Sequence, residues 1–116
     1  MQFKTLLLLP GLVASTTATI TVAFEGFYYP SCAVPSIIAA NIISGACGPV
    51  QNLPITSFSA HVYSGTCEDS TTSPVLKLYI ATGCTEDSLY GEYELSSEDA
   101  CFEVDGTFLS NEVVCQ

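Results

Sequence analysis

Apolar and polar residues alternate along several short segments of this chain, which is the pattern of half-buried β-strands. The clearest segment is Val75–Ile80, where every second residue is leucine or isoleucine and where Pro74 and Gly83 bound the run. Segments 20–24 and 57–63 alternate in the same way. The pattern predicts an all-β domain.

Turn residues separate these segments. The Asp105-Gly106 dipeptide lies between segments 101–104 and 107–109, and this arrangement predicts a two-residue β-hairpin turn. The stretch Gly65–Pro74 is rich in serine and threonine, and we expect it to be a loop that joins two halves of the chain.

Segment 34–48 is ambiguous. Its apolar residues at spacing four, with a proline near the start and Gly45 near the end, would suit a helix of about ten residues. Its counterpart later in the chain, Tyr90–Asp99, alternates like a strand. Because equivalent segments should share a conformation, we expect both to be strands, with the helix as the alternative.

The chain contains an internal repeat with a period of about 50 residues, and this repeat makes the two segments equivalent. An aromatic residue, four residues and a cysteine occur twice, and a second cysteine follows each copy after a strand-like stretch. The matching residues are Phe27, Cys32 and Cys47 in the first copy and Tyr79, Cys84 and Cys101 in the second. Similar tails follow at 52–57 and 105–110, and each is followed by a third cysteine. We expect one domain, 19–116, built from units 19–67 and 68–116.

Residues 1–18 have the features of a secretory signal peptide. Lys4 supplies the positive start, 6–13 the apolar stretch and 16–18 the small residues of a cleavage site. No later segment has the roughly 20 apolar residues of a transmembrane helix. The expected product is a secreted, extracellular and soluble protein that begins near Thr19.

The negative charge of the chain disfavours some classes of binding partner. The formal net charge is −10, with twelve acidic and two basic side chains, one of which is Lys4. Nucleic acid and anionic membranes would repel such a protein, so neither is an expected partner. Six cysteines in a small exported chain predict three disulfides rather than a metal cluster or a reactive thiol.

Two small strand-rich units, each with an aromatic-led first strand and a tail that ends in serine, resemble the βγ-crystallin-like family. The resemblance is closest to its small secreted microbial members, which include killer toxins, antifungal proteins and a metalloprotease inhibitor. It implies two Greek-key motifs in one sandwich. The family's first strand reads aromatic-x4-aromatic-x-Gly, whereas here Cys32 and Cys84 stand at the second aromatic position and Val34 and Glu86 at the glycine.

Calcium-binding members of that family carry Asn or Asp, then Ser or Thr and a final Ser, in each tail. The resemblance therefore implies candidate calcium ligands at Asn52, Ser57, Asp105 and Ser110, although each tail lacks one oxygen donor or more. The alternative is structural. Ser57 and Ser110 would bond a folded-over hairpin, while Asn52 and Asp105 would begin turns. We expect no cofactor.

The repeat also suggests a disulfide pattern. Symmetry between the units suggests the pairs Cys32–Cys47, Cys84–Cys101 and Cys67–Cys115. Sequence alone allows other connectivities. If segment 34–45 were helical, the element order would instead resemble the α/β sandwich of virus-encoded killer toxins of smut fungi.

The sequence offers little catalytic chemistry, and no enzymatic activity is expected. His61 could form a nominal triad with Ser59 and an acidic residue, but we expect it to be an ordinary surface residue. Glu92 and Glu94 share a strand face roughly 7 Å apart. That separation is within the range of glycosidase carboxyl pairs, but a solvated strand face is the better interpretation.

Adjacent Tyr28 and Tyr29 are the candidate binding-surface residues. We expect one of the pair to be buried and the other to lie across the sheet edge. Candidate binding loops are Gly26–Ser31, Gly65–Pro74 and Gly83–Ser88.

The format resembles that of fungal secreted effectors with a role in virulence. We expect a monomer that binds an extracellular protein or glycan, with protease inhibition as one concrete form. The alternatives are an antimicrobial or killer-type toxin and a structural protein of the cell wall.

Overall fold

The computed structural model describes residues 19–50 and 52–116, so the predicted signal segment 1–18 lies outside it. The described residues contain eight strands, two short 3-10 turns and no α-helix, which confirms the all-β class. The strands are β1 (Thr21–Phe27), β2 (Ser36–Ile43), β3 (Gly48–Pro49), β4 (Pro54–Ser64), β5 (Pro74–Tyr79), β6 (Leu89–Glu94), β7 (Ala100–Thr107) and β8 (Ser110–Cys115). The 3-10 turns are η2 (Pro30–Cys32) and η3 (Glu86–Ser88).

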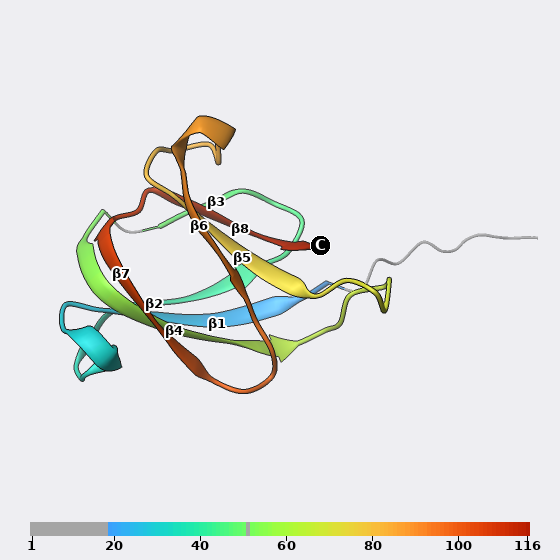
Figure 1. Cartoon of the computed structure of the whole chain (residues 1–116), viewed down its shortest axis with the longest axis horizontal. Coiled ribbons are helices and arrows are strands. Elements are labelled where there is room, and N and C mark those ends of the chain that lie inside the picture. The colour runs from blue at the N-terminus through green and yellow to red at the C-terminus, as the bar shows by residue number, and fades with distance from the viewer. Residues whose placement is uncertain (1–18, 51) are drawn as a thin grey trace, which may run out of the picture.

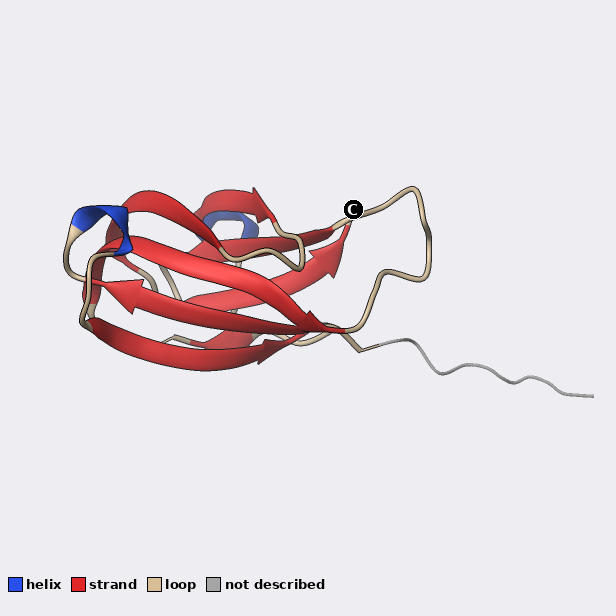
Figure 2. Ribbon diagram, turned by 90° about the horizontal axis from the view of Figure 1, so that it is seen from below, coloured by secondary structure: helices blue, strands red, loops and turns tan. Residues whose placement is uncertain are grey.

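The strands form two antiparallel sheets that lie in two layers (Figures 1 and 2). The first has the order β2-β1-β4-β7 and the second the order β3-β8-β5-β6. In each sheet, three strands come from one half of the chain and one edge strand comes from the other half. The first sheet takes β7 from the second half, and the second sheet takes β3 from the first half. β7 thus pairs with β4, and β3 pairs with β8. The two halves are interlocked by this exchange.

The core fills the space between the sheets. Phe58 of β4 lies at its centre, fully buried, with the rings of Phe24 and Phe102 stacked against it at centroid distances of 5.2 and 5.0 Å. Tyr93 of β6 meets Phe58 edge-on from the opposite sheet. Buried leucines and valines of β5 and β8 complete this single cluster. Burial alternates along β6 and along the middle of β4, as the sequence suggested. In β5, by contrast, Val75 and Leu76 are both buried, and so are Leu78 and Tyr79.

Segment 34–48 is the strand β2 followed by a turn and β3, so the strand prediction is confirmed and the helix alternative is wrong there. Ile38 and Ile42 lie four residues apart and are both buried, which also fits every second residue of a strand. β1 supplies backbone partners over the whole length of β2. Tertiary pairing therefore decides a segment whose spacing suits either structure.

The predicted Asp105-Gly106 hairpin is wrong. Both residues lie inside β7, and the chain passes from β7 to β8 at residues 108–109. These consecutive strands belong to different sheets, so a two-residue hairpin turn has no strand pair to connect. The predicted loop at 65–74 is confirmed, because β4 ends at Ser64 and β5 begins at Pro74.

Three disulfides close the fold, as the cysteine count predicted. The pair Cys67–Cys115 is confirmed. The pairs Cys32–Cys47 and Cys84–Cys101 are wrong, because Cys32 bonds Cys101 and Cys84 bonds Cys47. The two bonds are still related by the repeat, but each joins one half of the chain to the other. The reason is that β7, which contains Cys101, belongs to the first sheet, and that β3, which directly follows Cys47, belongs to the second sheet.

Candidate functional site

The connection between β1 and β2, residues 28–35, is held by bonds from β4. We call it the aromatic loop. Thr56 Oγ1 donates a hydrogen bond to the carbonyl of Tyr28 at 2.5 Å, and Ser57 Oγ donates to the carbonyl of Tyr29 at 2.6 Å. Ser57 Oγ also accepts the Cys32 N–H at 2.9 Å. One fully buried hydroxyl therefore joins both sides of the loop.

The backbone of the aromatic loop is fixed further at its tip. Ser31 and Cys32 both have positive φ, 60° and 54°, which folds the chain back over the sheet. The Ser31 N–H donates to Glu103 Oε2 at 2.9 Å, and the Cys32–Cys101 disulfide ties the same point to β7. The loop is thus anchored on two strands of the first sheet.

The side chains of the aromatic loop face solvent. Tyr28 is 49% exposed, Tyr29 56% and Val34 82%. The prediction that one tyrosine is buried is wrong, because β1 ends at Phe27 and strand alternation no longer applies to the next two residues. In Figure 1 the cyan η2 turn of this loop stands out from one end of the molecule.

The second half of the chain repeats this anchorage in residues 80–88, which we call the acidic loop. Ser110 Oγ donates to the Ala81 carbonyl at 2.6 Å and accepts the Cys84 N–H at 3.0 Å. Gly83 and Cys84 have positive φ, 84° and 52°, and Cys84 is bonded to Cys47 on the other half. The backbone arrangement matches that of the aromatic loop.

The two loops differ in what they expose. The acidic loop carries Glu86 and Asp87 in η3, both exposed, together with Ile80, which is 55% exposed. The aromatic loop contains no charged residue. One buried serine, one disulfide and two positive-φ residues are therefore common to both loops, whereas the exposed side chains are not.

The preceding strand ends also differ. Tyr79 occupies the place that Phe27 has in the first half, and its phenol donates to Glu112 Oε2 at 2.5 Å. Burial, and then the hydrogen bond to this carboxylate, raise the pKa of Tyr79 well above its ordinary value. The phenol therefore favours its protonated form, which donates to Glu112.

Ser57 and Ser110 bear out the structural alternative for the tails, since both hydroxyls bond the folded-over loops. Asn52 is exposed at a bend, while Asp105 is exposed within β7 and does not begin a turn. Among residues 19–50 and 52–116 no cluster of three or more His, Cys, Asp or Glu side chains is arranged for a metal ion. Calcium binding at these tails stays a prediction.

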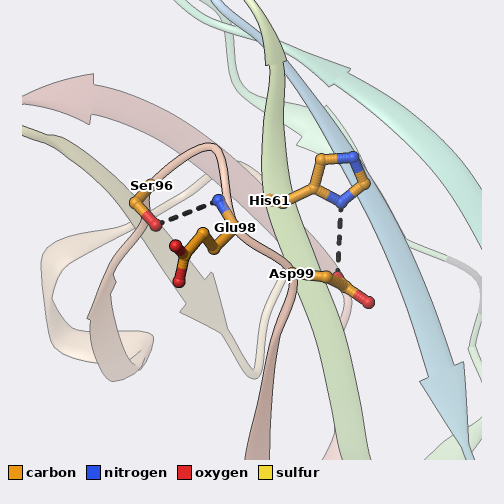
Figure 3. Close-up of polar contacts among 4 residues, drawn as sticks. All are labelled: His61, Ser96, Glu98 and Asp99. Atoms are coloured by element: carbon orange, nitrogen blue, oxygen red, sulfur yellow. Dashed lines mark hydrogen bonds and ion pairs between the residues drawn. The ribbon is translucent and has the colours of Figure 1, made fainter.

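His61 lies in a shallow cleft of about 480 Å³ on the outer face of the first sheet. Its Nδ1 is 3.3 Å from Oδ1 of Asp99, which directly precedes β7 (Figure 3). Ser59 and Glu25 line the same cleft. The structure therefore assembles the three residue types of a triad, but within the described contacts His61 bonds Asp99 and not Ser59.

The cleft is not lined by Ser96, Glu98 or the two glutamates of β6. In Figure 3 the Glu98 N–H donates to Ser96 Oγ at 3.2 Å, which stabilises the turn before β7. Glu92 and Glu94 are both exposed along β6, and Glu92 Oε1 accepts a hydrogen bond from Gln116 Nε2 at 2.5 Å.

Sequence reasoning missed the partner of His61 and the positive-φ pairs. Asp99 is 38 positions away in sequence, so no local spacing links it to His61. The aligned Ser31-Cys32 and Gly83-Cys84 dipeptides did hold a signal, because glycine at one member of the pair marks a left-handed position.

Together these features define a small disulfide-stapled all-β domain that presents two equivalent, differently surfaced loops. None of its described helical turns is long or apolar enough to cross a membrane. Neither a protein-family model nor a curated protein nor a solved structure matches the chain.

Proposed function

We propose that this is a secreted, non-enzymatic binding protein of the effector type, which docks onto an extracellular protein through the aromatic loop. The observation that carries the proposal is the contrast between two loops of the same backbone arrangement. Features that the fold needs recur in both loops, and the exposed Tyr28, Tyr29 and Val34 occur in only one.

Charge supports the choice of this loop. The chain has a net charge of −10, yet residues 28–35 include no ionisable side chain other than the two tyrosines. Such a surface loses little hydration free energy when a partner covers it, whereas burial of Glu86 or Asp87 would require compensating charges. Tyrosine is also among the residues that most often dominate binding energy at interfaces.

Rigidity and shape support a protein partner. The loop is anchored by Ser57, by Glu103 and by the Cys32–Cys101 disulfide, so binding orders little additional backbone. It also projects from one end of the molecule (Figure 1), which suits insertion into a groove of a folded target. Inhibition of a protease by occupation of its substrate groove is one concrete form of this function.

The fold itself supports a finer class. We infer that the two halves are Greek-key units of the βγ-crystallin-like kind. The exchange of β3 and β7 between the sheets and the paired Ser57 and Ser110 bonds both support this inference. Secretion is proposed from the sequence features of residues 1–18 together with the three disulfides.

The test compares three proteins: the chain from Thr19, its Tyr28→Ala/Tyr29→Ala variant, and an Ile80→Ala control that removes exposed apolar surface from the acidic loop. Each is immobilised and exposed to extracellular fluid, and the affinity of any retained protein is then measured by calorimetry. In parallel, purified serine, cysteine, aspartic and metalloproteases are assayed for inhibition.

We expect a partner that the parent and the Ile80→Ala control retain equally. The tyrosine variant should bind it at least ~30-fold more weakly, since hot-spot residues contribute about 2 kcal/mol or more. Thermal midpoints should be unchanged, because both tyrosines are exposed. A partner retained equally by the tyrosine variant, or a failure of all three proteins to retain or inhibit anything, would contradict the proposal.

A further inference from the structure

The four sheet edges of the molecule are not equally protected. Edge strands present unpaired backbone groups, and proteins usually block them with charge, proline or a short length. β6 carries Glu92 and Glu94, and β7 carries Glu103 and Asp105. β3 consists of two residues, one of them a proline.

β2 has none of these protections. It is eight residues long, it lies at the edge of the first sheet, and its sequence, Ser-Ile-Ile-Ala-Ala-Asn-Ile-Ile, contains no charged residue and no proline. Ala39, Ala40 and Asn41 at its centre are exposed, and Ile43 is 48% exposed. An uncharged apolar edge is conspicuous in a chain of net charge −10.

The register of β2 shows which backbone groups are free. The Ser44 N–H donates to the Ile20 carbonyl, and antiparallel ladders alternate between bonded and non-bonded pairs. Residue pairs 42/22 and 40/24 are therefore the bonded ones toward β1. Ala39, Asn41 and Ile43 direct their N–H and C=O groups away from β1, along the open edge of the sheet.

The edge is also self-complementary. Residues 37–43 read almost the same in both directions around Ala40. Antiparallel pairing with a second copy about a two-fold axis at Ala40 would place Ile38 against Ile42 and Ala39 against Asn41. A two-fold interface requires a patch that fits itself, and this strand does so in both backbone and side chains.

The space beside the edge suits a further strand. One cleft, the His61 cleft described above, borders Ala40 and Asn41 on the outer face of the sheet. A second cleft of about 230 Å³ borders the same two residues on the side of β3. Because side chains of a strand alternate between the two faces of its sheet, an added strand would place side chains over both clefts.

We propose that two copies of this chain pair through β2 and form a dimer with one continuous sheet. This goes beyond the proposed function and replaces the expected monomer. Each copy carries its aromatic loop directly before β2. Antiparallel pairing would therefore place the aromatic loops at opposite ends of the paired strands. The two Ser36 residues, which directly follow the loops, would be about 27 Å apart, from a rise of ~3.4 Å per residue. Such a dimer could bind a target at two points.

The first test is sedimentation equilibrium of the chain from Thr19 over a concentration series, at low and at high NaCl. We expect the mass to rise from one chain to two. The dimer should be more stable at high salt, because screening reduces repulsion between two acidic copies. A single-chain mass at every concentration in both salts would overturn the proposal, whatever the outcome for the aromatic loop.

Variants test the edge itself. Ala39→Pro removes an outward N–H and leaves the bonds to β1, so it should give a monomer with an unchanged thermal midpoint. If this variant fails to fold, Asn41→Lys replaces it, with Ser97→Lys on an exposed turn as the control of equal charge. Dimerisation of folded Ala39→Pro or of Asn41→Lys at the parent's affinity would overturn the proposal.

The register has its own test. Ala40→Cys should form a covalent dimer under mild oxidation, because residue 40 meets its own copy at the axis. Ala39→Cys should not, because residue 39 meets residue 41. Equal cross-linking of both variants would contradict the proposed pairing, and peptide mapping would check that the three native disulfides are intact.

Discussion

The aromatic loop and the acidic loop share one backbone arrangement but expose different side chains. In each, a buried serine, Ser57 of β4 or Ser110 of β8, bonds a carbonyl and a cysteine N–H, and two residues adopt positive φ. One loop exposes two tyrosines and a valine, and the other exposes two carboxylates and an isoleucine. The comparison separates what the fold requires from what the surface is free to vary.

That separation gives the exposed residues their meaning. A tyrosine exposed once in a protein needs no explanation. The equivalent positions of the acidic loop hold Ile80 and Ala81, so the backbone does not require tyrosine there. Their exposure in an anchored, uncharged loop is the observation on which the proposed protein partner rests.

The largest expected effect comes from the disulfides that tie each loop to the opposite half. Cys32–Cys101 and Cys47–Cys84 span 69 and 37 residues, so loss of either should lower the free energy of unfolding by about 4 kcal/mol. Paired serine replacements and urea unfolding would measure this. Strongly unequal losses would show that the two halves are not held in the same way.

The buried serines should come next. Ser57→Ala and Ser110→Ala each leave a carbonyl and a cysteine N–H without their partner in a partly buried place, so each should cost about 2 kcal/mol. Urea unfolding of the two variants beside the parent measures both. If one serine proved neutral, the equivalence of the loops would be lost. Thr56→Ala is the control, since it removes a bond to the aromatic loop alone.

The smallest effect concerns the left-handed residues. Gly83→Ala should cost about 1 kcal/mol from backbone strain alone, because no atom lies within 4 Å of the added Cβ. The reciprocal Ser31→Gly should change stability by less than about 0.5 kcal/mol, since relief of strain is offset by a more flexible unfolded chain. Thermal unfolding of both variants checks this, and a neutral Gly83→Ala would contradict the assigned conformation.

The sequence predicted the strands best where burial follows a period of two, as in β6 and the middle of β4. It predicted the repeat and therefore β2, although the spacing of Ile38 and Ile42 also suits a helix. The prediction failed at Asp105-Gly106, because a turn dipeptide does not show which strand these residues will pair with. In the structure they lie in β7, which pairs with β4, and the paired residues are 40 or more positions apart in the sequence.

The prediction of two disulfide pairs failed for a related reason. Symmetry allows Cys32 to pair within its own half or with the equivalent strand of the other half, and both patterns are equally symmetric. Only the exchange of β3 and β7 between the sheets decides between them, and this exchange is a long-range property of the fold. The candidate site was predictable as far as Tyr28 and Tyr29, but not the bonds that hold them in place.

The central claim is that a buried serine holds the backbone of both loops in the same way, while the exposed side chains differ. Amide hydrogen exchange of Cys32 and Cys84 tests it directly, because each N–H is bonded to a buried serine hydroxyl. We predict that the two amides are slowed to a similar extent in the folded protein. Rapid exchange at Cys32 beside strong protection at Cys84 would show that the aromatic loop is mobile, and it would contradict the account.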